Sequence, residues 1–314
     1  MKIACLNLDR LVSVAIRPLG MPRADLYELY KLLDKDGPIS YQIANALLER
    51  RGAKVGIISG AADKVNFPNG ESDGPPGAVA MARALERLGY DVTIYTEEPC
   101  VMGMEEMKKV LGCKAPVEVL ELDLCNHYHE IAKKLDIAII TEKLGMNEMG
   151  YQHSVTGRSR EGHRAKVDYI ILEMNAMGKL TVGIGDGGNE VGFGKVYEAA
   201  RKLIPLGEQC ICGCGGGIIT TTPTTFLYPV SISNWGAYAL CAALALATGD
   251  KSLIVQPEEE EKILRRCIEI ELVDGGSGRP AYALDGVDGA SSVGCVTLMK
   301  EIVELTGTTT NRAF

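Results

Sequence analysis

The chain has 314 residues, 46% of them hydrophobic, and a formal net charge of −8 at pH 7. A chain of this length can bury one large core or two moderate ones. Because it is acidic and has no long run of Lys or Arg, it lacks the basic face that nucleic acids require, and we expect no nucleic-acid partner. A cation or a small polar substrate fits this charge better.

The hydropathy of the chain argues against a membrane partner. No segment reaches about 18 consecutive apolar residues, which a membrane-spanning helix needs. The most apolar stretch, residues 237–248, is short and is predicted to be a buried helix. The N-terminal segment is interrupted by Asn7, Asp9 and Arg10, unlike a signal peptide. We therefore expect a cytoplasmic protein, and the sequence leaves open whether it forms a homo-oligomer.

Short β-branched runs alternate with helical stretches along the chain, without internal repeats or low-complexity linkers. Helices are predicted at residues 24–33, 39–51, 78–88, 105–111, 127–135, 168–177, 196–203, 235–248, 258–270 and 292–306. Strands are predicted at residues 54–59, 91–95, 117–122, 137–141 and 180–183, near residue 218, and at 228–232. This alternation is typical of an α/β fold with a largely parallel sheet. We predict a three-layer α/β/α architecture and one domain over residues 1–314, with residues 1–35 as an N-terminal helical extension.

Three of the ten cysteines occupy alternate positions, 210, 212 and 214. In a strand, this spacing would place all three side chains on one face. We interpret them as small residues of a strand that runs into the turn at residues 215–217, with a metal or redox role as the alternative. Most of the other cysteines lie in apolar surroundings, where a reduced thiol behaves as a small core residue.

Acidic residues gather in the loops between the predicted elements. Ligands of parallel sheets bind beyond the carboxyl ends of the strands, so the loops that follow strands are where chemistry is expected. Taken singly, an Asp-Gly pair is a turn signal and an acid before a helix is a cap. The residue preferences of turns do not explain the glutamates at positions 71, 142 and 190. They also do not explain why all the acidic loops follow strands at one rim of the sheet. The four loops read NGESDGPPG (69–77), TEKLG (141–145), GIGDGGNEVGFG (183–194), and VDGG (273–276) with DGVDG (285–289).

If these carboxylates converge, they repel one another unless a counter-charge is present. The simplest counter-charge is Mn²⁺ or Mg²⁺, because both prefer oxygen ligands. Zinc is disfavoured, since no set of His and Cys residues shows ligand spacing. The predicted metal ligands are Glu71, Asp73, Glu142, Asp186, Glu190, Asp274 and Asp285.

Residues 183–188 also match the G-x-G-x-x-G pattern of dinucleotide sites. In such a site, bare backbone amides at a helix N-terminus face the pyrophosphate, and Asp186 would repel it. An NAD site also needs an acid at a strand end about twenty residues further on. Glu208 lies there, but in a Pro/Gly loop. We therefore predict no organic cofactor and disfavour an oxidoreductase.

Several longer motifs occur in a fixed order: ESDGPPGA at 71–78, TEKLG at 141–145, MGYQHS at 149–154, GDGGNEVGFG at 185–194 and SNWGAYAL at 233–240. With the Asp-Gly pairs at 274 and 285, they resemble the D-glutamate cyclase-like domain family over roughly residues 35–305. The family tends to have Thr at the position of Ser72 and Arg at that of Lys143. The resemblance implies a lyase that converts D-glutamate to 5-oxo-D-proline with loss of water.

The resemblance also implies roles for particular residues. A bound Mn²⁺ or Mg²⁺ would polarise the γ-carboxyl group of the substrate, and Glu142 or Glu190 would take the ammonium proton as general base. His153 is a candidate substrate contact or proton carrier. Candidates for binding the substrate are Arg158, with Arg160 and Arg164 close by, Asn189 and Asn234. The alternatives are solvated surface charge for the arginines and a helix N-cap for Asn234.

Two further functions need the same acidic rim. A Mn²⁺- or Mg²⁺-dependent phosphatase acting on small phosphorylated metabolites would also use clustered carboxylates. A non-enzymatic module that binds a cation or an amino acid would show a tight site without turnover. In each case the expected partner is a small molecule.

Overall fold

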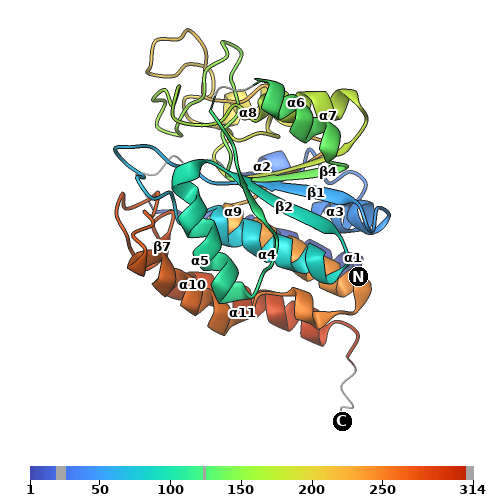
Figure 1. Cartoon of the computed structure of the whole chain (residues 1–314). Coiled ribbons are helices and arrows are strands. Elements are labelled where there is room, and N and C mark those ends of the chain that lie inside the picture. Colours follow the sequence, from blue (N-terminus) through green and yellow to red (C-terminus); the bar gives the residue numbers. More distant parts are fainter. Residues whose placement is uncertain (19–25, 123–124, 309–314) are drawn as a thin grey trace.

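The central sheet consists of six parallel strands (Figure 1). The computed structural model describes residues 1–18, 26–122 and 125–308. Within them, the sheet has the order β3-β2-β1-β4-β5-β6, and all neighbouring strands pair in parallel. The prediction of a largely parallel sheet is thus confirmed. The strands are β1 (Lys54–Ile58), β2 (Asp91–Thr96), β3 (Val117–Val119), β4 (Ile137–Thr141), β5 (Leu180–Gly185) and β6 (Phe226–Pro229).

Helices cover both faces of this sheet, which confirms the three-layer α/β/α architecture (Figure 1). A large core on one face includes α1, α3, α4, α5, α9, α10 and α11, whereas α6 and α7 close a smaller core on the other. The helices are α1 (Lys2–Val12), α2 (Leu26–Tyr30), α3 (Ile39–Leu48), α4 (Pro75–Arg87), α5 (Val101–Leu111), α6 (Cys125–Lys134), α7 (Asp168–Ala176), α8 (Tyr197–Leu203), α9 (Ser233–Thr248), α10 (Pro257–Glu269) and α11 (Gly289–Leu305).

Alternate residues of a strand enter different cores. In β1, Val55 and Ile57 lie in the large core and Ile58 lies in the smaller one, as the two-residue period of a strand requires. Helix α9 is buried continuously from Ser233 to Ala245, which confirms the predicted buried helix and explains why it is apolar all round. In the described part of the chain, no helix combines the length and the hydropathy that crossing a bilayer would need.

The first helix, α1, is part of the large core. Val12 is buried there, and α1 packs against α3, α9 and α11. Its buried Asp9 accepts hydrogen bonds from the hydroxyl groups of Tyr30 (2.8 Å) and Tyr228 (2.7 Å). These contacts tie α1 to α2 and to β6, and so fix the start of the segment that follows α1.

Several local predictions need correction or trimming. The strand predicted at 117–122 ends at Val119. Residues 210–214 and the region near Ile218 form no strand, because positive φ angles at Gly213 (84°) and Gly215 (90°) curl this loop away from extended backbone. The strand predicted at 228–232 runs from Phe226 to Pro229. Of the helix predicted at 24–33, the structure contains α2 only, and residues 24 and 25 lie outside the described part. The predicted loop at 274–289 contains a small hairpin, β7 (Ala283–Leu284) and β8 (Val287–Asp288).

The strand order places a crevice between β1 and β4. The chain leaves β1 toward α4, in the large core, and leaves β4 toward α7, in the smaller core on the opposite face. The loops after these neighbouring strands therefore diverge at the carboxyl edge of the sheet. Such a point, where the strand order reverses, is where open α/β sheets bind their ligands.

Candidate active site

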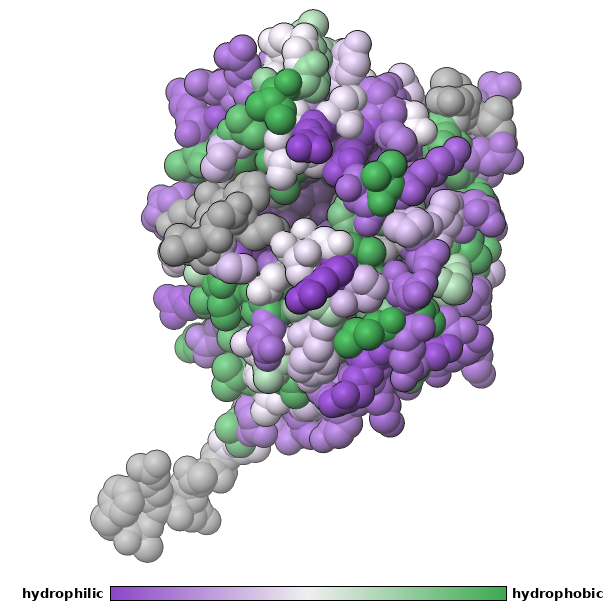
Figure 2. All heavy atoms as spheres, turned by 90° about the vertical axis from the view of Figure 1, so that its left-hand side faces the viewer, coloured by the Kyte–Doolittle hydropathy of each residue, from purple (hydrophilic) through white to green (hydrophobic). Residues whose placement is uncertain are grey.

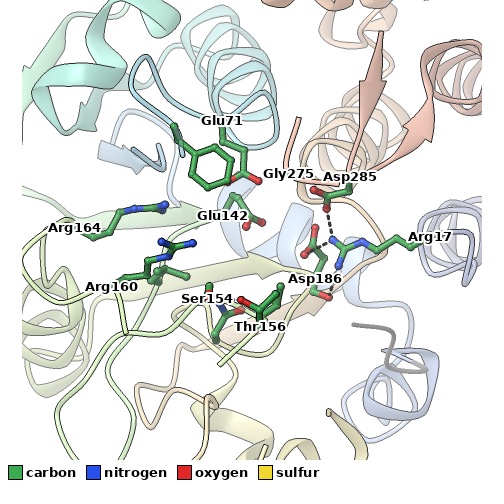
Figure 3. A pocket seen from close by; sticks show the side chains of 14 residues that line it. Arg17, Glu71, Glu142, Ser154, Thr156, Arg160, Arg164, Asp186, Gly275 and Asp285 are labelled. Carbon is green, nitrogen blue, oxygen red and sulfur yellow. Dashed lines mark hydrogen bonds and ion pairs between the residues drawn. The ribbon is translucent and has the colours of Figure 1, made fainter. Parts of the chain in front are cut away.

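A pocket of about 130 Å³ opens at this divergence, and its volume suits a small metabolite. Figure 2 looks at this side of the molecule and shows a hollow in the middle of the face. Acidic side chains from several loops meet there, with arginines opposite (Figure 3). The lining residues are Arg17, Phe67, Glu71, Glu142, Leu144, Ser154, Val155, Thr156, Arg160, Arg164, Asp186, Asn189, Gly275 and Asp285.

The loop after β1 contributes Glu71 and Asp73. Asp73 is buried at the start of α4 and accepts backbone hydrogen bonds from Gly74 (3.0 Å), Ser233 (2.9 Å) and Asn234 (2.8 Å). Two of these donors are the first residues of α9, so the carboxylate lies at a helix N-terminus, where negative charge is favoured. Asn234 does not line the pocket. Its Oδ1 accepts from Gly74 and Gly77, so its role is to hold the loop.

The loop after β4 contributes Glu142. This residue has a φ of 49°, in the left-handed region that non-glycine residues seldom adopt. Its Oε2 accepts a hydrogen bond of 2.6 Å from the hydroxyl of Ser233. The next residue, Lys143, is buried in an ion pair with Glu97. Lys143 thus turns away from the pocket and anchors the loop that aims Glu142 into it.

The loop after β5 contributes Asp186 to the pocket. Glu190 belongs to the same loop and forms hydrogen bonds with its backbone. Glu190 is buried, and its Oε1 accepts from the backbone N–H groups of Asp186 (2.9 Å) and Gly187 (2.7 Å). Asp186 forms an ion pair with Arg17, which also pairs with Asp285 (Figure 3). Glu190 therefore shapes the loop, and Asp186 faces the pocket.

The fourth acidic loop reaches the same rim by a different route than predicted. It follows α10 rather than a strand, so the prediction that every acidic loop follows a strand is wrong for this one. A parallel bridge between Glu71 and Val273 joins it to the loop after β1. Asp285 lines the pocket. The two oxygens of Asp274 accept instead from the backbone of Ser277 (2.7 Å) and Gly286 (3.0 Å), so Asp274 organises the loop.

The carboxylates of this site share a crowded, buried space. Burial, followed by repulsion from Asp285, raises the pKa of Glu71 to about 8. Burial also raises the pKa of Asp285 to about 7, although Arg17 opposes the shift. The pKa values of Asp73, Glu142 and Asp186 are raised as well, first by burial. Arg17 pairs with Asp186 and Asp285, and Arg164 acts on Glu71, but the pKa values of these acids stay raised, so a further positive charge would be favourable here.

Three of these acids could hold a metal ion. One carboxylate oxygen from each of Asp73, Glu142 and Asp186 lies within 4.8 Å of the other two. Oxygen donors of this kind suit a hard divalent cation such as Mn²⁺ or Mg²⁺. Of the other predicted metal ligands, Glu71 and Asp285 line the same pocket. Glu190 and Asp274 instead accept hydrogen bonds from the backbone of their own loops.

The opposite wall of the pocket is basic and polar. Arg160 and Arg164 project into it from the segment that follows Glu142 (Figure 3). Arg164 is buried and its Nε donates to the carbonyl of Ala62 at 2.9 Å, and Arg160 lies 3.3 Å from a carboxylate oxygen of Asp63. Both side chains are therefore held in place. Arg158, the arginine predicted first for substrate binding, is exposed and does not line the pocket.

The structure places the His153 side chain elsewhere. Its imidazole is fully buried, and Nε2 lies 3.2 Å from the sulfur of Cys212. Only the backbone carbonyl of His153 faces the site, where it accepts a hydrogen bond of 2.7 Å from Asn189. His153 and the three cysteines form a second group with ligand atoms within 4.8 Å of one another. This corrects the prediction that no His and Cys set has ligand spacing.

Sequence reasoning missed Arg17. It lies in the segment that follows α1, remote from every acidic motif, and no local pattern in Ile16-Arg17-Pro18 points to a site. Its position depends on how α1 packs against α3, α9 and α11 in the large core. Asn189, which was predicted, does line the pocket.

Comparison with known proteins gives a match to a family and a match to a human protein. A sequence model of the family described as D-glutamate cyclase-like, C-terminal, matches residues 28–300. The human protein named D-glutamate cyclase, mitochondrial, is 26% identical over 257 residues, which cover 70% of this chain and 40% of that protein. The chain thus spans less than half the length of this relative, and Arg17 precedes the family match.

Two solved structures are weakly similar to this chain. RecJ in complex with Mn²⁺ from Thermus thermophilus has a TM-score of 0.34 and 16% identity, covering 85% of this chain and 31% of that one. An exopolyphosphatase-related protein from Bacteroides fragilis has a TM-score of 0.38 and 12% identity, covering 87% of this chain and 61% of that one. At these scores the likeness has no bearing on function.

Proposed function

Because the chain belongs to the D-glutamate cyclase-like, C-terminal family, we propose that it is a metal-dependent lyase that converts D-glutamate to 5-oxo-D-proline and water. The observation that carries this proposal is the two-sided pocket, with carboxylates such as Glu71 and Asp186 facing Arg160 and Arg164. D-Glutamate has an ammonium group and two carboxylates, so its charges complement both walls.

The carboxylates present fit a divalent cation. Asp73, Glu142 and Asp186 would hold it, because their oxygens converge. Burial and repulsion from neighbouring acids raise the pKa values of Asp73 and Glu142, and a bound cation would relieve that repulsion. When bound, Mn²⁺ or Mg²⁺ supplies Lewis acidity toward a carboxyl oxygen. The side chains of the pocket would bind the substrate and transfer its protons.

The arginines would bind and orient the substrate. A guanidinium group can hold a carboxylate through two parallel hydrogen bonds. With Arg160 and Arg164 fixed by Asp63 and Ala62, both substrate carboxylates can be positioned and the chain of D-glutamate folded so that its amine approaches its own γ-carboxyl carbon. Closing a five-membered ring depends on such positioning.

Glu71 is the carboxylate that we propose as general base. It lines the pocket but lies outside the metal-holding group. By contrast, one oxygen of Glu190 already accepts two backbone N–H groups, and Glu142 belongs to the metal-holding group. Burial raises the pKa of Glu71 to about 8, which brings it closer to that of an ammonium group and favours proton transfer.

The reaction balances with protons from the substrate alone. The ammonium group gives up two protons, its nitrogen forms a bond to the γ-carbon, and a C–O bond of the γ-carboxyl group breaks. Both protons end on the departing oxygen, which leaves as water. Glu71 would take a proton from nitrogen and return it to that oxygen, so the enzyme ends in its starting state.

The proposal is tested by turnover of purified protein stripped of metal and supplied with Mn²⁺ or Mg²⁺. D-Glutamate, L-glutamate and a generic phosphate ester would be offered in parallel. Cation-dependent formation of 5-oxo-D-proline from D-glutamate is expected. Cation-dependent release of phosphate without a cyclised product would replace the lyase by the phosphatase alternative. A cation-induced rise in melting temperature without any turnover would leave a binding module.

The stability of the metal-free protein should fall as the pH rises. The pKa values of Glu71 and Asp285 are raised from 4.5 and 3.8 to about 8 and about 7. Between these values the folded state holds protons that the unfolded state has released, so unfolding becomes easier from about pH 5 to about pH 8. Saturating Mn²⁺ should flatten this slope. Melting temperatures across the range, with and without the cation, check it, and a slope that Mn²⁺ leaves unchanged would contradict it.

Gly275→Ala should weaken turnover more than stability. A Cβ at this position would collide with Oε1 of Glu71 and lie 2.8 Å from Oδ1 of Asp285. The end of a flexible side chain can move, so we expect a stability loss below about 1 kcal/mol but a fall of roughly tenfold in kcat/KM. The matched control is Gly294→Ala in α11, where nothing lies within 4 Å. There, Ala should stabilise the helix by about 1 kcal/mol and leave kcat/KM unchanged.

A further inference from the structure

Three cysteines and one histidine converge at a place that the proposed function does not use. Cys210, Cys212 and Cys214 lie in the loop between α8 and β6, and His153 comes from the segment after β4. Cys210 Sγ lies 3.2 Å from Cys212 Sγ and 3.4 Å from Cys214 Sγ. His153 Nε2 lies 3.2 Å from Cys212 Sγ and 3.6 Å from Cys214 Sγ. Four side chains thus point their ligand atoms at one spot.

We propose that His153, Cys210, Cys212 and Cys214 bind one zinc ion in a closed, structural site. Three sulfurs and one imidazole nitrogen form a ligand set that tetrahedral zinc favours. Bonds of about 2.3 Å to sulfur and about 2.0 Å to nitrogen place neighbouring ligands about 3.5 to 3.8 Å apart. The four separations given above, 3.2 to 3.6 Å, need to widen by only a few tenths of an ångström, and all four ligand atoms lie within 4.8 Å of one another.

The backbone of the loop is shaped to bring the three sulfurs together. Gly213 and Gly215 have positive φ angles, and the N–H of Cys210 donates to the carbonyl of Gly216 at 2.9 Å. The loop therefore curls back around its cysteines, so that residues two apart in sequence share one centre without a strand. The sulfur separations are well above the roughly 2.05 Å of a disulfide bond, and these cysteines are free thiols.

The surroundings favour the metal-binding forms of His153 and Cys210, whereas burial raises the pKa of Cys212 to about 11. Burial lowers the pKa of His153, so its ring is neutral and can offer a lone pair. Burial raises the pKa of Cys210, but hydrogen bonds with Cys212 and Cys214 outweigh this effect and bring it to about 7. Asn147 Nδ2 lies 3.5 Å from Cys214 Sγ and donates toward it. Such an N–H···S contact is a common outer-shell support for a thiolate ligand.

The ion would fix one wall of the pocket. The carbonyl of His153 accepts from Asn189, and the next residues, Ser154 to Thr156, line the pocket. The N–H of Ile211, inside the cysteine loop, donates to the carbonyl of Gly157 at 3.3 Å. Zinc would therefore join the cysteine loop to the segment of the pocket wall that begins at His153. With four protein ligands the ion has no open position, so its role is to hold structure.

The first test is the zinc content of the full chain, purified under reducing conditions without chelators. About one zinc ion per chain is expected. Replacement of zinc by Co²⁺ should give the thiolate-to-cobalt charge-transfer band and the intense visible bands of a tetrahedral site. Cys212→Ser, at an exposed position, should lose the charge-transfer intensity of one thiolate and weaken binding at least roughly tenfold. Cys113→Ser, whose side chain contacts Glu86 elsewhere, should change neither.

Two further variants separate this site from the acidic one. Asp186→Asn should keep its zinc, even if it loses every response to Mn²⁺. His153→Ala should lower zinc affinity and raise KM for any substrate of the pocket, while kcat changes little. Wild-type protein that takes up neither zinc nor Co²⁺ while its thiols are reduced would overturn the proposal. So would a Co²⁺ spectrum without thiolate bands, or one that Cys212→Ser leaves intact.

Discussion

Glu71→Gln is expected to abolish turnover while making the metal-free protein more stable at alkaline pH. Gln has nearly the shape of Glu but cannot take a proton, and removal of a general base typically lowers kcat by about 10² to 10⁴. The same change removes a charge that burial and the neighbouring Asp285 make unfavourable. The melting temperature of the metal-free variant should therefore exceed that of the wild type above about pH 8. Steady-state kinetics and thermal unfolding of one preparation measure both effects.

Glu190→Gln provides the contrast. Glu190 is one of the two glutamates, with Glu142, that the family resemblance implies as the base, but its Oε1 accepts the backbone N–H groups of Asp186 and Gly187. Weakening this contact should lower the melting temperature, because buried hydrogen bonds to a charged group contribute about 1.5 to 3 kcal/mol each. Full kcat in Glu71→Gln, with kcat lost in a well-folded Glu190→Gln, would show that the base is Glu190.

Asp186→Asn is expected to remove the response to the cation. Asp186 is one of three acids whose oxygens converge, and it also pairs with Arg17. Loss of a charged ligand should weaken the apparent affinity for Mn²⁺ by more than about 100-fold, beyond the usual effect of an outer-shell change. Turnover should fall with it. Arg17 keeps its ion pair with Asp285, so the chain should still fold.

The matched control is Asp250→Asn. Asp250 caps the short helix at Lys251–Leu253 by accepting the N–H of Ser252 at 2.9 Å, and Asn caps a helix about as well as Asp. This variant should keep both turnover and the cation-induced rise in melting temperature, which calorimetry or a dye-based melt can follow. If Asp186→Asn retains the cation response of the wild type, the ion is not held by the three converging acids.

The sequence alone predicts the layers of this fold and the edge at which its chemistry lies. Strands such as Ile137–Thr141 are apolar on both faces because helices cover both, and that pattern is local. Acids that follow strands must gather at one edge, since all parallel strands end there. Glu71, Glu142 and Asp186 could therefore be predicted before their neighbours were known.

Only the tertiary structure decided what these acids do. Whether a carboxylate faces the pocket, as Glu71 does, or serves its own loop, as Glu190 and Asp274 do, depends on where backbone N–H groups fall in the folded loop. The periodicity of the sequence does not contain that information.

The same reason explains Arg17 and the cysteine cluster. Arg17 meets Asp186 across 169 residues, and His153 meets Cys212 across 59. Neither separation leaves a pattern in the sequence, because such pairs are joined by the packing of α1 beneath the sheet and by the curl of a glycine-rich loop. Residue types and their local spacing predict that the acids lie at the rim of the sheet. Which side chains these acids pair with depends on contacts between distant segments.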